Sequence, residues 1–358
     1  MIPLSESGRR RIRVMVVDDS AVVRGFLVRI LESDPGIEVA ATCSNGQTAV
    51  LQLPRIRPDI VVLDIEMPVM DGLAALPRLL ACDPSVRVIM ASTLTQKNAE
   101  ISLEALALGA VDYIPKPSSS QLNGNSDFRR QLVEKVLALG RIEPTSRSRP
   151  EHKRPSEPAP TFASVRHPAI LAIGSSTGGP QALLTVLKQI AHLKAPIVIA
   201  QHMPATFTAI LAQQLSKSCG RPCKEAQHGE TISAGHTYVA PGDYHFSLNR
   251  DAGVLKAILT QAPPENFCRP SVNPLFRSVA RLFGADAIAL MLTGMGSDGL
   301  DGTRDIAAAG GTVVAQDEQS SIVWGMPGAI VHAGLCSAVL PLGGIASHLN
   351  TLFSGVRR

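Results

Sequence analysis

Three turns in the second half of the chain each carry a reactive side chain immediately after a short apolar run. Ser176 lies in a Gly-Ser-Ser-Thr-Gly-Gly segment, His202 in Gln-His-Met-Pro, and Asp298 in Thr-Gly-Met-Gly-Ser-Asp-Gly. The apolar runs predict buried strands, and the carboxyl ends of parallel strands line one crevice. A hydroxyl nucleophile, an imidazole and a carboxylate that converge there suggest acyl transfer or hydrolysis.

The turn around Ser176 fits the pattern Gly-x-Ser-x-Gly, in which the glycines allow a tight strand-to-helix turn that projects the hydroxyl. This pentapeptide alone is a weak signal, because a glycine-rich turn before a helix also suits phosphate binding. The segment lacks the lysine of a P-loop and the spacing of a dinucleotide fingerprint. A nucleophilic serine is therefore the favoured interpretation.

His202 is the favoured base because of its position. It follows the strand that comes directly after Ser176, and neighbouring parallel strands lie about 5 Å apart. We therefore expect the imidazole to reach the Ser176 hydroxyl. An isolated histidine is more often structural, and His245, which follows a Pro-Gly-Asp turn, is the best alternative.

Asp298 is the favoured carboxylate to orient the imidazole. Its alternative role is to cap the helix that follows, and one side chain could do both. Asp243, Asp286 and Asp301 are competitors, but Asp286 precedes its strand and lies at the wrong end. The Met295 N–H, in the same glycine-rich turn as Asp298, is a candidate donor to an oxyanion.

The first half of the chain carries a separate acidic cluster at predicted strand ends. Asp18 and Asp19 end the first strand and Asp64 the third, while Ser92 and Lys116 end the fourth and fifth. Clustered carboxylates repel one another unless a cation neutralises them, and oxygen ligands suit Mg²⁺. A carboxylate nucleophile, a hard cation, a lysine and a hydroxyl can together accept a phosphoryl group.

Alternating strand and helix patterns on both sides of a polar segment position these residues. The predicted strands are 14–17, 38–43, 60–63, 86–91, 112–114, 170–173, 197–201, 237–240, 287–292 and 312–315, with a hairpin at 244–259. The predicted helices are 21–32, 46–53, 72–81, 97–108, 127–139, 181–191, 206–217, 272–283 and 299–309. We therefore predict an α/β protein with two doubly wound parallel-sheet domains, 12–140 and 168–358. Residues 141–167, rich in Pro, Arg, Ser and Glu, read as a flexible linker.

The composition excludes several classes of protein. Aromatic residues make up 4% of the 358 residues, and the net charge of +4 arises mainly from the N-terminal segment and the linker, which argues against nucleic-acid binding. The six cysteines form no metal motif and no disulfide framework. No apolar run is long enough to span a membrane, and the N-terminus does not read as a signal peptide, so we expect a cytoplasmic protein without membrane insertion.

The motifs of the first third of the chain resemble those of a response-regulator receiver domain with a flavodoxin-like fold. The resemblance implies that Asp64 is the phosphorylated residue and that a histidine kinase is the phosphodonor. It implies a Mg²⁺ site made by Asp18, Asp19, Asp64 and the Glu66 carbonyl. It also implies switch residues, which are Ser92 and Tyr113 together with Lys116.

With that receiver, the second half closely resembles the chemotaxis protein-glutamate methylesterases, the CheB family. The shared motifs are the three turns described above and Ala-Pro-Gly-Asp, Arg-Pro-Ser-Val and Gly-Met-Pro. The resemblance assigns Ser176 as nucleophile, His202 as base, Asp298 as orienting acid and Met295 as oxyanion donor. Two departures are Ser175, where the family often has Ala, and Asn273, where Asp is expected; Asn273 leaves open how that loop binds substrate.

The resemblance implies demethylation of glutamate γ-methyl esters and deamidation of glutamines on methylated chemoreceptors, without a cofactor in the catalytic domain. It also implies that the unphosphorylated receiver covers the active site. Two other classes stay open on the sequence. One is a signalling adaptor without enzymatic activity, against which the set of Ser176, His202 and Asp298 argues. The other is a DNA-binding response regulator, for which no basic recognition helix is visible after the linker.

Overall fold

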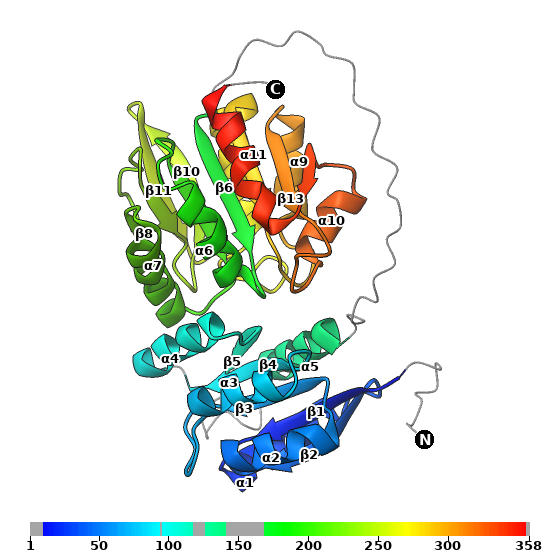
Figure 1. Ribbon diagram of the computed structural model, residues 1–358. Coiled ribbons are helices and arrows are strands. Elements are labelled where there is room, and N and C mark those ends of the chain that lie inside the picture. Colours follow the sequence, from blue (N-terminus) through cyan, green and yellow to red (C-terminus); the bar gives the residue numbers. More distant parts are fainter. Residues whose placement is uncertain (1–9, 94, 117–125, 141–167, 356–358) are drawn as a thin grey trace.

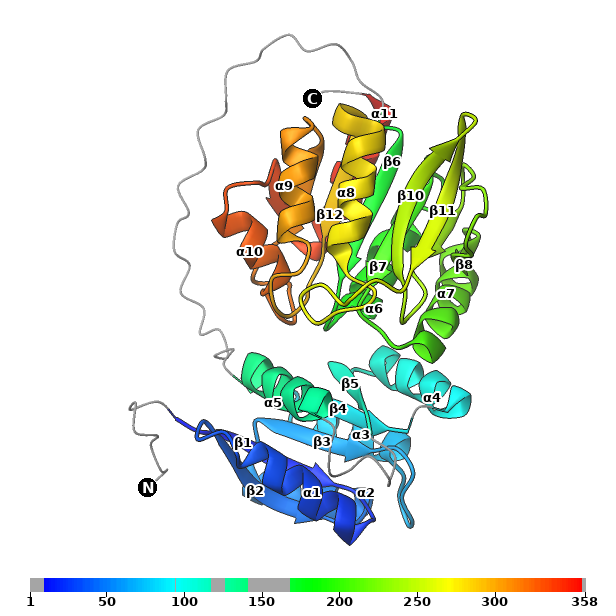
Figure 2. The same ribbon diagram turned by 180° about the vertical axis from the view of Figure 1, so that it is seen from behind.

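The computed structural model describes residues 10–93, 95–116, 126–140 and 168–355. Two α/β units lie one above the other, as Figures 1 and 2 show. The predicted linker, 141–167, lies outside the described residues. Among these residues no helix is long and apolar enough to cross a membrane.

The first unit is a five-stranded parallel sheet in the order β2-β1-β3-β4-β5. Its strands are β1 (Ile12–Val17), β2 (Ile37–Cys43), β3 (Ile60–Asp64), β4 (Arg87–Ser92) and β5 (Asp112–Pro115). Its helices are α1 (Ala21–Leu31), α2 (Gly46–Ile56), α3 (Gly72–Cys82), α4 (Gln96–Ala107) and α5 (Ser126–Gly140). Buried residues of α1 and α5 pack on one face of the sheet, and those of α2, α3 and α4 pack on the other. This is the predicted doubly wound fold, because β3, which is apolar up to its terminal Asp64, is buried on both faces.

The second unit is a seven-stranded parallel sheet in the order β14-β13-β12-β6-β7-β9-β8. Its strands are β6 (Ile170–Ser175), β7 (Ile197–Gln201), β8 (Cys223–Glu225), β9 (Thr237–Val239), β12 (Ala287–Met291), β13 (Thr312–Gln316) and β14 (Ala338–Leu340), and β10 (His245–Asp251) pairs with β11 (Val254–Thr260) as a separate hairpin. The chain winds outward from β6 through β7 in one direction and later returns to β12 on the other side of β6. The switch point therefore lies between β6 and β12, where open α/β sheets bind their ligands.

Helices cover both faces of this second sheet (Figures 1 and 2). On one face lie α6 (Gly179–Gln189), α7 (Ala205–Cys219) and α11 (Leu342–Ser354). On the other lie α8 (Val272–Phe283), α9 (Leu300–Ala308), α10 (Met326–His332) and the hairpin. The doubly wound prediction is thus confirmed for both units. The elements β8, β14, α10 and α11 were not predicted; the two strands have only three residues each, too few to show a period.

Candidate active site

Ser176 lies at the switch point, between the end of β6 and the start of α6. Its N–H donates to the Thr293 carbonyl at 3.1 Å, which ties the turn to the segment after β12. Gly294 must be a glycine here, because a Cβ would lie 2.9 Å from the Ser176 Cβ. Ser176 is half-buried.

Gln201, at the end of β7, holds the turn from the other side. Its amide oxygen accepts from the Ser175 hydroxyl at 2.6 Å, and its amide nitrogen donates to the Ser176 carbonyl at 2.9 Å. The sequence reasoning did not single out this residue. Its place one position before His202, in the Gln-His-Met-Pro motif, was the available signal.

His202 and Asp298 form the pair that the sequence predicted. His202 Nε2 lies 2.8 Å from Asp298 Oδ2, and the Asp298 side chain is only 2% exposed. The carboxylate also accepts from the Ser271 hydroxyl, the Val272 N–H at the start of α8, and the Asn266 amide. These donors explain how a carboxylate can remain charged while buried.

The ionisation of the pair follows from its contacts. Burial acts to raise the pKa of Asp298, but hydrogen bonding and the charge of His202, with the donors Ser271 and Val272, lower it to about 2. Burial acts to lower the pKa of His202, while the charges and hydrogen bonds of Cys268 and Asp298 raise it to about 10. These contacts keep the Asp298 carboxylate charged and stabilise a positive charge on His202 once the ring is protonated.

The structure accounts for three of the alternatives that the sequence left open. Asp298 does not cap α9, whose N-cap is Gly299 without a side-chain bond. His245 lies in a different network, where Nε2 contacts the Pro263 carbonyl and Nδ1 accepts from the Ser271 N–H. Asp243 pairs with Arg269 and is largely exposed. The structure thus favours Asp298 and His202 over the competitors that the sequence left open.

The expected contact between the His202 imidazole and the Ser176 hydroxyl is not formed in this arrangement. In the part of the chain that the structure describes, the Ser176 hydroxyl makes no hydrogen bond to His202; instead, His202 Nδ1 lies 3.5 Å from the Cys268 sulfur. Both ring nitrogens are therefore occupied. Sequence reasoning could not find Cys268, because it lies 66 residues after His202 in a loop without a periodic pattern.

The Met295 N–H has the freedom that an oxyanion donor needs. It makes no backbone hydrogen bond among the described residues, while the neighbouring Gly294 N–H donates to Val323 at 3.0 Å. The Met295 side chain packs against a buried cluster that joins core residues of the first unit and Val323 of the second. Asn273, the departure noted in the sequence, is buried and accepts from the Gly302 N–H at 2.9 Å, so it joins α8 to α9.

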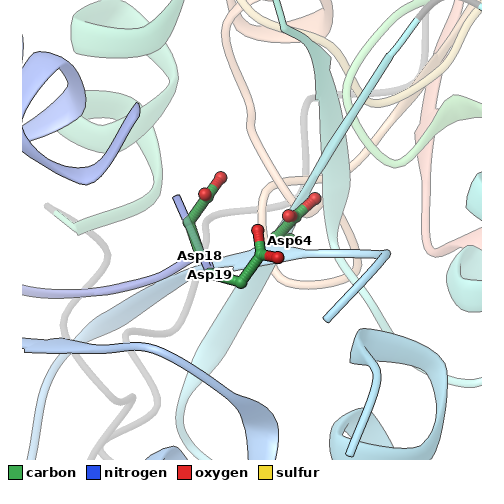
Figure 3. A group of neighbouring side chains, drawn as sticks. All are labelled: Asp18, Asp19 and Asp64. Carbon is green, nitrogen blue, oxygen red and sulfur yellow. The ribbon is translucent and has the colours of Figure 1, made fainter. Parts of the chain in front are cut away.

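The acidic residues of the first unit gather at the carboxyl ends of β1 and β3. Carboxylate oxygens of Asp18, Asp19 and Asp64 lie within 4.8 Å of one another, and Figure 3 shows the three side chains together. Asp18 and Asp64 are buried and Asp19 is exposed. Three oxygen donors open to water on one side fit Mg²⁺. A pocket of about 490 Å³, lined by Asp19 and Glu66 among others, adjoins the cluster.

Lys116 neutralises this cluster in the structure. Its ammonium lies 2.6 Å from Asp64 and 2.9 Å from Asp18. Burial raises the pKa of Asp64 to about 6 even though Lys116 acts to lower it. Ser92, one strand away, is buried and accepts from the Ser102 hydroxyl at 3.1 Å. Asp71 caps α3 by accepting from the Ala74 N–H.

The first unit packs on the second at the end that carries Ser176. The Thr177 hydroxyl donates to Asp112 at 2.6 Å, and the Tyr113 ring stacks on Phe207 at 4.2 Å between centroids. Figures 1 and 2 show α4, β5 and α5 facing this end of the second sheet. The residue next to Ser176 therefore bonds directly to the other unit.

Comparisons with known proteins decide the family. The model of the CheB methylesterase family matches residues 171–349, and that of the response regulator receiver domain matches 14–123. The chain belongs to the CheB methylesterase family. A protein-glutamate methylesterase/protein-glutamine glutaminase of Azospirillum brasilense is 50% identical, over 98% of this chain and 95% of the relative. A second relative with the same activities in its name, from a group 2 operon of Rhodospirillum centenum, is 52% identical over 92% and 91% of the two chains.

A solved structure supports the assignment for the second unit. The crystal structure of the Thermotoga maritima CheB methylesterase catalytic domain shares 37% identity and a TM-score of 0.50 with this chain. It covers 52% of this chain, and 98% of that domain is matched. The receiver and the catalytic domain of the family thus correspond to the two units described above.

Proposed function

We propose that this chain is a phosphorylation-regulated esterase that hydrolyses glutamate γ-methyl esters, and deamidates specific glutamines, on chemoreceptors in chemotaxis. The observation that carries the proposal is the His202–Asp298 pair, which lies at the same strand ends as Ser176 in a chain of the CheB family. The names of the relatives supply the two activities.

In the proposed reaction the Ser176 hydroxyl attacks the γ-carbonyl carbon of the methyl ester, and His202 takes the hydroxyl proton. The tetrahedral oxyanion receives a hydrogen bond from the Met295 N–H. When the C–O bond to the methoxy group breaks, His202 returns the proton and methanol leaves. Water then attacks the glutamyl-Ser176 ester by the same proton transfers, which releases glutamate. A glutamine amide follows the same course and releases ammonia.

Asp298 has two roles in this proposal. Its short bond to Nε2 fixes the ring and its tautomer, and its charge stabilises the imidazolium that forms when His202 accepts a proton. The donors Ser271 and Val272 hold the carboxylate in place. The catalytic half needs no cofactor for this chemistry.

The receiver would accept the phosphoryl group on Asp64 from a histidine kinase. Asp18, Asp19, Asp64 and the Glu66 carbonyl would hold Mg²⁺. When bound, the ion supplies positive charge that shields the phosphoryl oxygens from the carboxylates. Lys116 already contacts Asp64 and adds a second positive charge.

Phosphorylation of Asp64 would activate the esterase through the domain interface. Ser92 and Tyr113 would move, and the stacking of Tyr113 on Phe207 supports a direct route from the switch to the catalytic half. We also place the protein in the cytoplasm, because all six cysteines are free and this fits a reducing compartment.

The nucleophile is tested with a matched pair of variants. Ser176→Ala should abolish methanol release from methylated receptor membranes while the circular dichroism spectrum stays unchanged. Ser175→Ala is the control for loss of a hydroxyl from the same turn: it removes the bond to Gln201 but leaves the nucleophile, and it should retain methanol release because the family often has Ala there. Retained activity in Ser176→Ala would refute the assignment, and the adaptor alternative predicts no methanol from either the variants or the parent protein.

A further inference from the structure

A tight turn at residues 265–268, called the dyad turn below, lies over the His202–Asp298 pair. The N–H and carbonyl of Glu265 bond to the carbonyl and N–H of Cys268, which closes the turn. Asn266 and Phe267 between them have left-handed φ values of 50° and 61°. Such a backbone is unfavourable for a phenylalanine, so the surrounding contacts must hold it.

Two side chains of the dyad turn contact the catalytic pair. The Asn266 amide donates to Asp298 Oδ1 at 3.1 Å, and the Cys268 sulfur lies 3.5 Å from His202 Nδ1. On its other side, the turn is fixed to α8 by the ion pair between Glu265 and Arg277. The turn thus touches both partners of the pair from outside the motifs that carry them.

The contact with Cys268 occupies His202 Nδ1, the nitrogen that must accept the Ser176 proton. His202 Nε2 faces a carboxylate, which can only accept, so Nε2 carries a hydrogen and Nδ1 must serve as the base. A neutral Nδ1 accepts a hydrogen bond from the Cys268 thiol, and a protonated Nδ1 donates one to the thiolate. In both cases a proton lies between Cys268 and Nδ1, so the nitrogen cannot accept the Ser176 proton.

The receiver contacts the middle of the same turn. The Arg130 guanidinium of α5 lies 4.3 Å from the centre of the Phe267 ring. Arg130 is oriented by Glu134 at 3.3 Å and by Asp127 at 3.5 Å on its own helix. Phe267 is 74% exposed with Arg130 in place, and this cation–π contact ties the ring to the receiver.

We propose that Cys268 is a positioning residue that engages His202 Nδ1 while the receiver is docked, and that the contact of Arg130 with Phe267 maintains this arrangement. The proposal rests on the proposed role of His202 as the base. It differs from covering of the active site by the receiver, because it acts on the geometry of the base. Release of Phe267 would free the dyad turn and turn Nδ1 toward Ser176.

The first test compares Cys268→Ala and Cys268→Ser in the unphosphorylated full-length chain. The alanine variant should release methanol with a kcat about fivefold above the parent, the effect of removing one hydrogen bond, and with an unchanged KM. Cys268 and Asp298 are the ionisable groups that contact the ring among the described residues. The acid limb of the pH–rate profile should therefore move to lower pH in Cys268→Ala.

Cys268→Ser should retain the parent kcat, because the serine hydroxyl can donate to His202 Nδ1. Phe267→Ala should raise kcat as Cys268→Ala does, because it breaks the contact with Arg130. Cys336→Ala, which replaces a half-buried cysteine outside the site, should behave as the parent. An unchanged kcat and pH profile in Cys268→Ala would overturn the proposal, and so would a lower kcat with an unchanged profile.

The second test needs no esterase activity and therefore separates this proposal from the proposed function. Iodoacetamide alkylation of each cysteine is followed by mass spectrometry at neutral pH in the parent and in His202→Ala. Alkylation of Cys268 should slow in His202→Ala, because the imidazole that contacts the sulfur and can take its proton is gone, while that of Cys336 stays the same. Equal rates for Cys268 in the two proteins would show that no proton is shared with His202.

Discussion

Gln181→Ala should weaken the docking of the receiver without touching the catalytic residues. The Gln181 amide, on α6, donates to two carbonyls of the receiver, those of Leu106 at 3.1 Å and Ala110 at 3.0 Å. Both bonds cross the interface between the two units. Alanine removes both and retains the helix.

The expected change in the free energy of docking follows from these two hydrogen bonds. Two neutral hydrogen bonds at about 0.5–1.5 kcal/mol each stabilise the docked state by about 1–3 kcal/mol. The Gln181 amide oxygen is buried and has no partner among the described residues, so alanine also removes an unfavourable group and the net loss of docking free energy falls to the low end of this range. A loss of about 1 kcal/mol changes the docking equilibrium about fivefold.

The assay is methanol release by the unphosphorylated full-length protein, compared with the same protein after treatment with a phosphodonor. Basal activity of Gln181→Ala should rise up to about fivefold, whereas the phosphorylated activity should stay at the parent level. Gln189→Ala is the control, because within the described residues this exposed side chain on the same helix bonds only to the Thr185 carbonyl. Equal basal activities of Gln181→Ala and the parent would refute the view that these contacts keep the receiver docked.

Three further predictions test other parts of the account. Asp64→Asn should block labelling by acetyl phosphate, and persistent labelling at another residue would contradict the assignment of the phosphoacceptor. The fragment from Pro168 onward should be more active than the unphosphorylated full-length protein; equal or lower activity would count against inhibition by the receiver. The depressed pKa of Asp298 adds about 2 kcal/mol of stability above about pH 4, which is lost as the pH falls through about 2. In urea unfolding, the free energy of unfolding of Asp298→Asn should not show this loss at low pH. An equal loss in the variant and in the parent would refute the link between the pKa of Asp298 and stability.

The sequence predicted the two sheets and the strand-end residues because these depend on local patterns. Short apolar runs such as Ile170–Ile173 and Ala287–Leu292, which alternate with helical patterns, indicate buried parallel strands, and polar residues that directly follow such strands lie at one edge of the sheet. Ser176, His202 and Asp298 were found in this way. The helix α11 was missed because two glycines in its first turn, Gly343 and Gly344, obscure the helical pattern.

Contacts between distant segments had no such local signal. The dyad turn reaches His202 through Cys268, and the receiver reaches the nucleophile turn through Asp112 and Thr177. These contacts depend on how loops fold over the sheet and how the two units dock. A periodicity argument describes one segment at a time, so it cannot supply them.

Methanol release from methylated receptor, with and without a phosphodonor, tests the central claim most directly. The parent protein should release methanol faster once Asp64 is phosphorylated, Asp64→Asn should stay at the basal rate with or without the phosphodonor, and Ser176→Ala should release none under either condition. Phosphodonor-stimulated release by Asp64→Asn, or any release by Ser176→Ala, would contradict a serine esterase controlled by the charge on Asp64.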